Sequence, residues 1–425
     1  MRNISSIQGR RLPVVTELYR DRTGTTAVLT ALAITVIAGF GGLAVDVGYW
    51  LSNQRSMQGA ADEAAFSATK VAPQLANGNP STEAKGVAAT MGFVDGSNGV
   101  TVAVNNPPAS GPNAGNSEAY EVIISQPQPM WLSSMIMTSA PTAAGRAVGK
   151  LTSGSSCLYT LDPTASGSLH VEGGDLLTTG CGVTVNSSSA TAATINGTVT
   201  APSFNIVGDY TGTVNSPKIK KGVAAARDPL GYVPAPAVGS TCDHTNYSVG
   251  SGSVTINPGV YCGGNGNAAI NITGNATVTM NSGTYILKGG GLSMQNNATL
   301  IGNGVTLYNT GTSTTYAPIN TQDNATLKLK APTSGSLAGI LFFQDRSINF
   351  ATQANNIGMG NAGYVEGALY FPSTDLTMAT GQNANAAYTI VVAKTVSVSI
   401  NSFSVASNYS TLTDGSPIKQ AMLAE

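Results

Sequence analysis

The chain has 425 residues, of which 42% are hydrophobic and 10% are charged. This apolar content is enough for a folded core and excludes a wholly disordered chain. Because 20 basic residues nearly balance 21 acidic ones, the chain lacks the positive field that attracts nucleic acid, and we expect no nucleic-acid partner. Two histidines and four cysteines leave few residues for acid–base or metal chemistry, so we expect no catalytic residue, cofactor or metal. The 50 glycines indicate a mainly β architecture with many turns.

The first 50 residues have the pattern of a membrane anchor. Residues 27–45 carry no charge and are long enough to cross the roughly 30 Å core of a bilayer. By the positive-inside rule, the arginines before this run place residues 1–24 in the cytoplasm and the bulk outside; they are Arg2, Arg10, Arg11, Arg20 and Arg22. We predict a single transmembrane helix over residues 25–50, in contact with the lipid bilayer, with Asp46, Tyr49 and Trp50 at the outer interface. A cleaved signal peptide is the alternative, but its apolar core would be shorter.

Three short motifs around this run resemble a known family. They are Arg22-Thr23-Gly24-Thr25-Thr26-Ala27, the stretch GLAVDVGYW at 42–50 and the stretch QGAADEAA at 58–65. Together they resemble the N-terminal region of TadE/TadG-like Flp pilus-assembly proteins. The resemblance implies a bitopic protein of the bacterial inner membrane, part of a tight-adherence pilus system, with a periplasmic bulk and other pilus-assembly membrane proteins as partners. Two features of that family are missing: Leu29 stands where pilin-like members have a glutamate, and no Asp-x-Ser-x-Ser sequence marks a von Willebrand factor A domain.

Residues 51–150 are predicted to form a small α+β module. Helix formers continue to about residue 72 without proline, so the membrane helix should continue outward as one rod. We expect its small face to pack on the module; this face is Ala60, Ala61, Ala64, Ala65 and Ala68. A second helix over 83–93 and three strands near 100–104, 120–124 and 142–148 complete the module. The apolar stretch 130–137 is expected to be a helix that buries itself on the sheet, or else a partner-binding patch.

Residues 151–425 show internal repeats. The triplet Asn-Ala-Thr begins at Asn275, Asn297 and Asn324, which are 22 and 27 residues apart. Short units of this kind cannot bury a face alone, so they indicate a parallel β-helix-like repeat domain with coils of roughly 20 to 27 residues. The three asparagines should stack, and inward positions should be Val278, Met280, Leu300, Leu327 and Leu329. A β-sandwich is the alternative. The charged, proline-containing excursion at 217–240 should lie over one face, and the tail after residue 414 should be frayed.

The four cysteines fit such a stack. Cys157 and Cys181 are 24 residues apart, and Cys242 and Cys262 are 20 apart. One coil raises the chain by about 4.8 Å, which suits the Cα separation of a disulfide. We therefore predict these two disulfides, which the oxidising periplasm would permit. A zinc site that includes His170 or His244 is the alternative, but the chain has no Cys-x-x-Cys clamp.

One polar cluster, Gln344, Asp345 and Arg346, follows an apolar strand. Together with Asp323, Glu366 and Asp375 it could serve a polysaccharide lyase or hydrolase, although an ion pair at a strand end is the commoner outcome. We expect instead a non-enzymatic, membrane-anchored envelope protein that assists the assembly or anchoring of a Flp pilus. The alternatives are a surface adhesin or carbohydrate-binding β-helix, with a glycan as partner, and a polysaccharide-cleaving enzyme.

Overall fold

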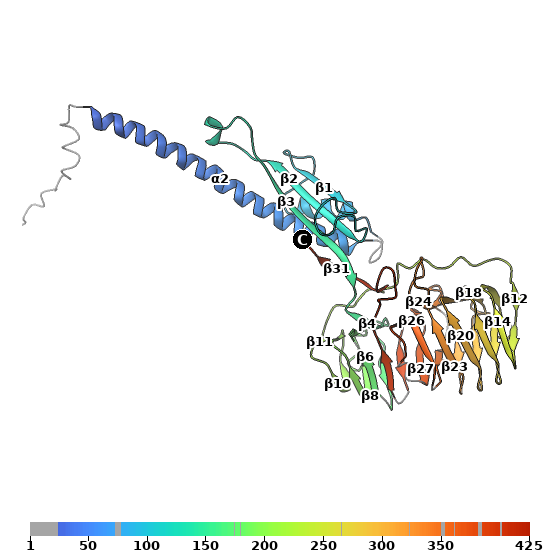
Figure 1. Ribbon diagram of the computed structural model, residues 1–425. Coiled ribbons are helices and arrows are strands. Elements are labelled where there is room, and N and C mark those ends of the chain that lie inside the picture. Colours follow the sequence, from blue (N-terminus) through green and yellow to red (C-terminus); the bar gives the residue numbers. More distant parts are fainter. Residues whose placement is uncertain are drawn as a thin grey trace, which may run out of the picture. The chain divides into compact units, whose positions relative to one another are not determined.

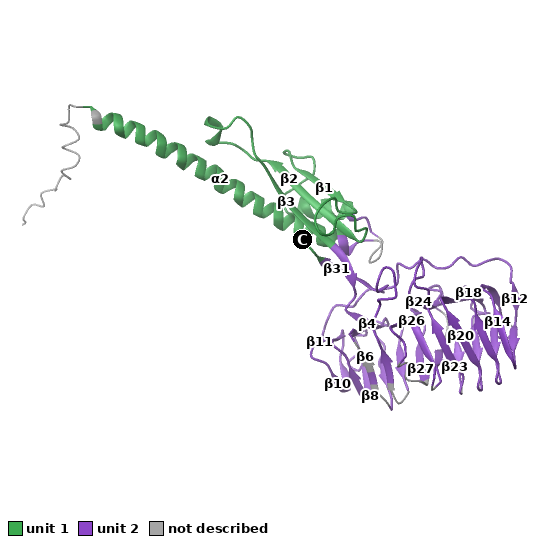
Figure 2. Ribbon diagram, viewed as in Figure 1, with its two compact units in different colours: residues 1–68, 81–149, 423–425 green, residues 69–80, 150–422 purple. Residues whose placement is uncertain are grey.

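The computed structural model describes residues 24–72, 78–173, 175–178, 180–264, 266–322, 324–349, 353–360, 362–380, 385–399 and 402–425. Its contacts divide the chain into two compact units (Figure 2). The first unit comprises residues up to 68, residues 81–149 and residues 423–425, and the second comprises residues 69–80 and 150–422. The predicted cytoplasmic segment, apart from Gly24, lies outside the described residues, and so does Asp323.

The first unit joins one long helix to a small sheet (Figure 1). The elements that lie wholly or partly in it are α2 (Thr25–Lys70), α3 (Pro80–Thr90), β1 (Thr101–Asn105), β2 (Ala119–Pro127), the short 3-10 helix η1 (Ser133–Met135), β3 (Thr142–Ser153) and, by its last residue, β31 (Lys419–Leu423). The sheet order is β1-β2-β3-β31, with β1 antiparallel to β2. No proline interrupts the 46 residues of α2, so a single helix continues from the apolar run into the alanine-rich stretch.

The two halves of α2 have different surroundings. Its first half has a mean hydropathy of 2.2 and is long and apolar enough to cross a membrane, and only 6% of that window is buried. Large apolar side chains such as Phe40 and Ile37 therefore point outward, as in a helix surrounded by lipid. Its second half buries Met57 and the predicted alanine face completely; the alanines are Ala60, Ala61, Ala64, Ala65 and Ala68.

The second unit is built from parallel strands in three ladders, which form a β-helix-like stack (Figure 1). The first ladder runs in the order β11 (Ile219–Lys221), β9 (Phe204–Ile206), β7 (Gly182–Val185), β4 (Ser156–Thr160), β28 (Thr389–Ala393), β26 (Tyr364–Phe371), β24 (Ile340–Gln344), β21 (Val305–Thr310), β18 (Gly283–Lys288), β15 (Gly259–Cys262) and β12 (His244–Thr245). The second runs β13 (Tyr247–Val249), β16 (Ile270–Ile272), β19 (Leu292–Met294), β22 (Asn320–Thr321), β25 (Asn355–Gly358), β27 (Leu376–Thr380), β29 (Val396–Val398), β5 (Leu169–Val171), β8 (Ala193–Thr200), β6 (Asp175–Thr178) and β30 (Ser402–Val405), with β10 (Tyr210–Asn215) beside β8. The third runs β14 (Ser253–Ile256), β17 (Thr277–Met280), β20 (Thr299–Asn303) and β23 (Thr326–Lys330), and it joins the first through β26.

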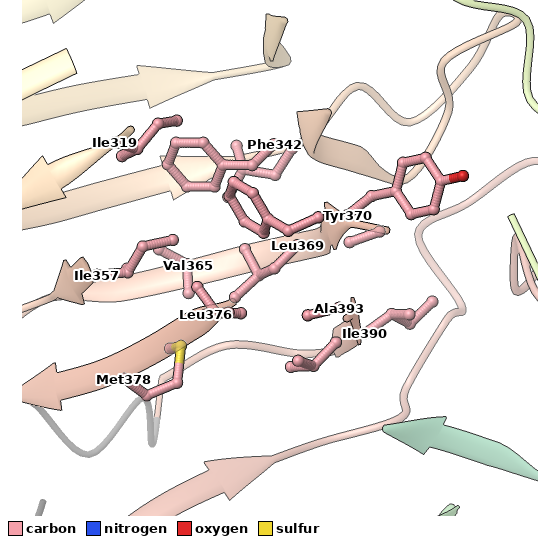
Figure 3. Close-up of a cluster of buried hydrophobic side chains, with 14 of the residues drawn as sticks. Ile319, Phe342, Ile357, Val365, Leu369, Tyr370, Leu376, Met378, Ile390 and Ala393 are labelled. Atoms are coloured by element: carbon pink, nitrogen blue, oxygen red, sulfur yellow. The ribbon is translucent and has the colours of Figure 1, made fainter. Parts of the chain in front are cut away.

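The core of this unit lies inside the stack, where each coil buries apolar side chains on those of the next. The predicted inward residues are all buried, namely Val278, Met280, Leu300, Leu327 and Leu329. Figure 3 shows part of this core, with Phe342, Leu369 and Ile390 contributed by three neighbouring strands. Of the predicted asparagine stack, Asn297 donates a hydrogen bond to the Asn275 side chain at 3.2 Å. Parallel pairing between successive coils excludes the β-sandwich.

The order of the coils does not follow the order of the chain. Strand β4 pairs with β7 on one side and with β28, about 230 residues later in the sequence, on the other. The chain therefore starts in the middle of the stack and builds outward to β11. It then crosses to the opposite end at β12 and returns coil by coil to dock β28 against β4. The segment that makes this crossing, residues 222–243, is here called the strap.

The strap lies along the first ladder, as expected for the excursion at 217–240. Its backbone at Ala226 exchanges hydrogen bonds with Asn186 after β7, at 2.7 and 2.9 Å. Further on, Leu230 and Val233 are buried in the core cluster, and Lys288 of β18 donates to the carbonyl of Gly239 at 3.0 Å. Its contacts thus follow the spatial order of the strands.

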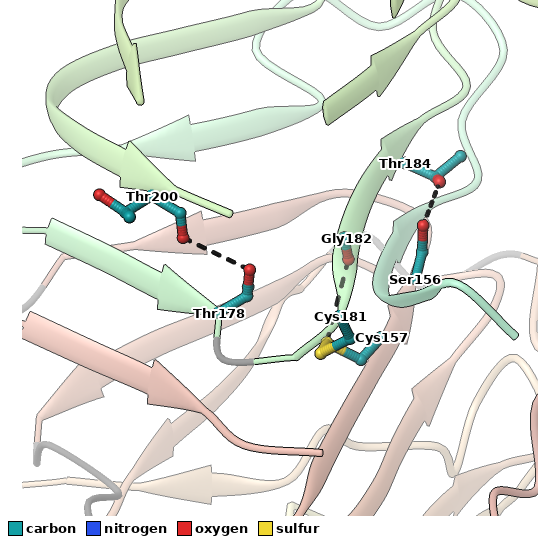
Figure 4. Close-up of a disulfide and its surroundings, with 7 residues drawn as sticks. All are labelled: Ser156, Cys157, Thr178, Cys181, Gly182, Thr184 and Thr200. Carbon is teal, nitrogen blue, oxygen red and sulfur yellow. Dashed lines mark hydrogen bonds between the residues drawn. A yellow bond between two sulfur atoms is a disulfide. The ribbon is translucent and has the colours of Figure 1, made fainter. Parts of the chain in front are cut away.

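Two disulfides join neighbouring coils of the second unit. Cys157 bonds to Cys181 with a Cα separation of 5.6 Å, and Cys242 bonds to Cys262 at 5.7 Å. Figure 4 shows the first of them between β4 and β7. These are the pairs expected from the spacings. Because all four sulfurs are used, no thiolate is left for the zinc alternative, and the His244 ring stacks on Tyr261 instead.

The prediction of a frayed tail is wrong. Ile418 is buried, its carbonyl accepts a hydrogen bond from Gly154 at 2.8 Å, and β31 adds a strand to the sheet beside β3. The tail is ordered because it supplies both apolar side chains and strand hydrogen bonds, which its charge and proline content concealed.

Candidate functional site

The strongest candidate site lies along one face of α2 in the first unit. The residues of α2 that contact the sheet or its loops include Gly42, Asp46, Tyr49, Trp50, Asn53, Met57 and Gln58. Five of them, Gly42, Asp46, Tyr49, Asn53 and Met57, recur every three or four positions, so the helical period places them on one stripe, with Trp50 and Gln58 beside it. This stripe starts inside the apolar half of the helix and ends beside β3.

Asp46 is the centre of this stripe. Its side chain is fully buried, and its Oδ2 atom accepts hydrogen bonds from the backbone N–H groups of Trp131, Leu132 and Ser133 at 3.1, 3.0 and 2.7 Å. The Ser133 hydroxyl donates a fourth bond at 2.6 Å. Because successive N–H groups converge on one oxygen, the carboxylate fixes the backbone of the loop at the start of η1.

The neighbours of Asp46 extend this contact in both directions. Toward the apolar half, Leu132 covers Gly42 so closely that a Cβ there would lie 2.8 Å from the Leu132 Cβ. Toward the sheet, Tyr49 packs on Trp131 with ring centroids 4.9 Å apart, and the Trp50 indole donates to the Pro129 carbonyl at 2.8 Å. All three predicted interface residues therefore meet the loop between β2 and β3.

The helix predicted over residues 130–137, buried on the sheet, is wrong. Only Ser133–Met135 form a turn of 3-10 helix, and Met135 and Ile136 are 85% and 69% exposed. The Asp46 carboxylate accepts the N–H groups at the start of this single turn, as an N-terminal cap does, and so ties the segment to α2. Composition showed that these side chains are apolar, but it gave no sign that Asp46 binds the loop to α2.

Farther along the stripe, β3 lies directly on the helix backbone. A Cβ on Gly145 would come within 2.5 Å of the α2 backbone at Met57 and Gln58, so only glycine permits this approach. The Gln58 side-chain amide then pairs with the backbone of Arg146, donating to its carbonyl at 2.8 Å and accepting from its N–H at 3.1 Å.

A charged network stabilises the sheet beside this contact. Arg146 bonds to the buried carboxylate of Glu121 at 2.7 Å and to Glu425 at 2.6 Å. Burial raises the pKa of Glu121, but hydrogen bonds from Asn105, Ala109 and Arg146 outweigh it, so the pKa lies below the usual range. Glu121 is therefore a buried carboxylate that stays charged at neutral pH.

The predicted polar cluster in the second unit does not converge on one point. Gln344 is buried and bonds to the Tyr316 hydroxyl at 3.0 Å, and Asp345 accepts from Thr310 at 2.7 Å. Arg346 donates to the strap carbonyls of Leu230 and Val233 at 2.8 and 2.9 Å.

The carboxylates near this cluster have other partners as well. Partial burial raises the pKa of Asp345, yet the hydrogen bonds from Thr310 and Ser347 hold it below its usual range. Glu366 accepts from Lys330 and from the Ala387 N–H, and Asp375 accepts from Thr395. Because each group serves a different structural contact, this cluster gives no reason to propose sugar cleavage.

A polar groove of about 630 Å³ lies beside the second ladder. Four of its lining residues, Ser248, Asn271, Ser293 and Asn320, occupy aligned positions on β13, β16, β19 and β22. The described residues that line it include no charged side chain. The groove therefore presents amides, hydroxyls and backbone groups at the regular spacing of the coils, about 4.8 Å.

The comparison with known protein families finds a match for the region around α2 and for no other part of the chain. Residues 24–74 match the family described as putative Flp pilus-assembly TadE/G-like, a stretch that contains Asp46, Tyr49, Trp50 and the alanine face, and the repeat unit matches no family. No curated protein and no solved structure matches the chain. The N-terminal region of this protein is therefore TadE/G-like, which supports its involvement in Flp pilus assembly.

Proposed function

We propose that this protein is a non-enzymatic component of the bacterial cell envelope that assists the assembly or anchoring of a Flp pilus. In this proposal α2 crosses the inner membrane once over residues 25–50, and residues 51–425 lie in the periplasm. Other membrane proteins of the assembly system would contact the helix. The stacked coils would serve as a stiff spacer or contact surface outside the membrane.

The observation that carries the proposal is the exposed apolar half of α2, within the region that matches the TadE/G-like family. Phe40 and Ile37 are 71% and 70% exposed, and leaving such a surface in water is unfavourable by about 25 cal/mol per Å². A bilayer removes this cost. The arginines that precede the helix favour a cytoplasmic N-terminus, and the two disulfides suit an oxidising compartment for the second unit.

Two measurements test anchoring and orientation. Membranes from producing cells should retain the full chain after an alkaline wash, whereas the double variant Leu32→Arg/Val36→Arg should lose it, because a charge at mid-bilayer is costly. The matched control, Leu32→Ile/Val36→Ile, should stay. A C-terminal alkaline phosphatase fusion should be active and a C-terminal fluorescent reporter that needs the cytoplasm should be dark; the reverse result would overturn the orientation.

The pilus role has its own test. Cells without this gene should lose surface pili, and the full chain should restore them, whereas a chain in which Leu32 and Val36 are both arginine should not. Normal piliation of the deletion strain would refute the role in assembly while leaving the anchoring intact.

The polar groove favours a second candidate function, the binding of an uncharged glycan. Sugar hydroxyls donate and accept hydrogen bonds as amides do, and a linear glycan along the stack would meet one rung of the ladder after another. Purified full-length protein should bind neutral oligosaccharides on a glycan array. Asn271→Ala should weaken this binding at least tenfold, while Asn281→Ala, an exposed asparagine outside the groove, should not. An array without any bound neutral glycan would rule this function out.

A further inference from the structure

The loop between β2 and β3 carries an apolar surface that the sheet does not cover. This loop, residues 130–137, is here called the tip; it reads MWLSSMIM, and no charged residue occurs between Pro127 and Pro141. Trp131, Leu132, Met135 and Ile136 are all at least half exposed. Exposed apolar side chains gathered on one short loop mark a surface that meets a membrane or another apolar partner.

The position of the tip along α2 decides between a membrane and another apolar partner. Leu132 rests on Gly42, and Gly42 lies three residues before the end of the apolar run, about 4.5 Å along the helix axis. On the same part of the helix, Phe40 and Val45 are exposed. Whatever medium surrounds those side chains also reaches Leu132. The tip therefore lies at the depth of the outer end of the proposed membrane span.

Most backbone N–H groups of the tip already meet the main demand of a lipid environment, which is that polar groups find partners within the protein. The N–H groups of residues 131–133 are bound by Asp46. The N–H groups of residues 135–137 are bound by the carbonyls of Leu132 and Ser133. The Ser134 hydroxyl donates to the Trp131 carbonyl at 2.9 Å. These bonds remove from the tip part of the cost of placing polar groups in lipid.

We propose that the tip inserts into the outer leaflet of the membrane that α2 spans, with Met135 and Ile136 at the boundary between headgroups and acyl chains. This inference rests on the proposed membrane anchor. The tip would then be a second membrane contact beside the helix, and Asp46 would be the residue that holds it there. Two contacts fix the rotation of α2 about its axis, which a single helix leaves free.

The two tryptophans of the chain allow a direct test. In the variant Trp50→Phe, Trp131 is the one remaining tryptophan, and the full chain is reconstituted into phosphatidylcholine vesicles that carry bromine at a shallow or a deep acyl position. We expect blue-shifted emission that shallow bromines quench several-fold more than aqueous iodide does. Met135→Cys with a spin label supplies an independent reporter that leaves Trp50 in place. The label attaches to residue 135 alone, because the native cysteines are all paired. Its label should be accessible to oxygen dissolved in the lipid and protected from a water-soluble nickel complex.

A charged variant completes the design. Met135→Asp/Ile136→Asp should abolish quenching by bromines but leave the chain in the vesicles after an alkaline wash, whereas Met135→Leu/Ile136→Leu should behave like the parent. If the vesicle-bound parent shows Trp131 and residue 135 open to water, the tip does not insert, although the anchor stands. If the chain does not remain with the vesicles at all, the proposed function fails first.

Discussion

The contact between Gly145 and α2 gives the sharpest prediction about the first unit. A methyl group on residue 145 would lie 2.5 Å from backbone atoms of Met57 and Gln58, whereas carbon atoms in contact are about 3.5 to 4.0 Å apart. In Gly145→Ala the strand and the helix must therefore separate by about 1 Å. Neither partner can avoid this by a change of rotamer, because the clash is with main-chain atoms.

The separation removes contacts along the whole buried alanine face. Overpacking of this kind costs about 3 kcal/mol when the backbone has to move, and it also stretches the hydrogen bonds between Gln58 and Arg146. Gly59→Ala is the matched control, since a Cβ there meets nothing within 4 Å and alanine is the better helix former by about 1 kcal/mol. Replacing glycine by alanine should thus lower the free energy of unfolding at position 145 on β3 and raise it at position 59 on α2.

Tryptophan fluorescence measures this unit by itself, because Trp50 and Trp131 both belong to it. At about 4 °C per kcal/mol for a unit of this size, thermal unfolding of the full chain in detergent micelles should shift by about −12 °C in Gly145→Ala. It should rise by about 4 °C in Gly59→Ala. A Gly145→Ala transition within 2 °C of the parent would refute the close approach of β3 to the helix.

Three further predictions concern other contacts. Asp46→Ala should speed amide hydrogen exchange at residues 131–133 at least tenfold in the micelle-bound chain, because their shared acceptor is lost; unchanged exchange would contradict the Asp46 contact. The folded-state pKa of Glu121 is lowered, so its charge stabilises the fold above the unfolded-state pKa of about 4.3 and this contribution is lost as the pH falls below that value. The tryptophan-monitored transition of the parent should therefore fall below pH 4 more steeply than that of Glu121→Gln, and parallel pH curves would disprove the assignment. Arg346→Leu should make the strap several-fold more sensitive to limited proteolysis, because the strap loses the hydrogen bonds to its Leu230 and Val233 carbonyls. If the new cuts fall outside the strap, the contact is contradicted.

The sequence predicted those features that depend on residues close together in the chain or one coil apart. An uncharged run of nineteen residues predicts one apolar helix whatever surrounds it, and the alternation around Val278 and Leu300 predicts inward positions in any stack of parallel coils. The spacing between Cys157 and Cys181 predicts their disulfide for the same reason, because one coil separates them.

The order of the coils could not be predicted in this way. Coils of similar length and pattern can stack on any neighbour, so periodicity does not say that β4 docks on β28. The information lies in single residues of the strap. Tyr370 donates a hydrogen bond to the Asp228 carboxylate at 2.5 Å, and Arg346 binds the carbonyls beside it. Before the coil order is known, Arg346 is an arginine after an apolar strand, and the cluster it belongs to resembles a catalytic site as much as a clamp.

The hydrogen bonds of Asp46 link the structure of α2 to that of the tip. A carboxylate directly after the apolar run of α2 is costly next to lipid unless groups in the same protein solvate it. The tip supplies three N–H groups and a hydroxyl to it, and in return its own donors no longer need water. These four bonds all go to Oδ2, whereas Oδ1 is buried without a hydrogen-bond partner, so the contact offsets only part of the cost of burying the carboxylate. Under the proposal that α2 spans a membrane, the helix and its docked loop would form a two-point membrane contact rather than a simple tether.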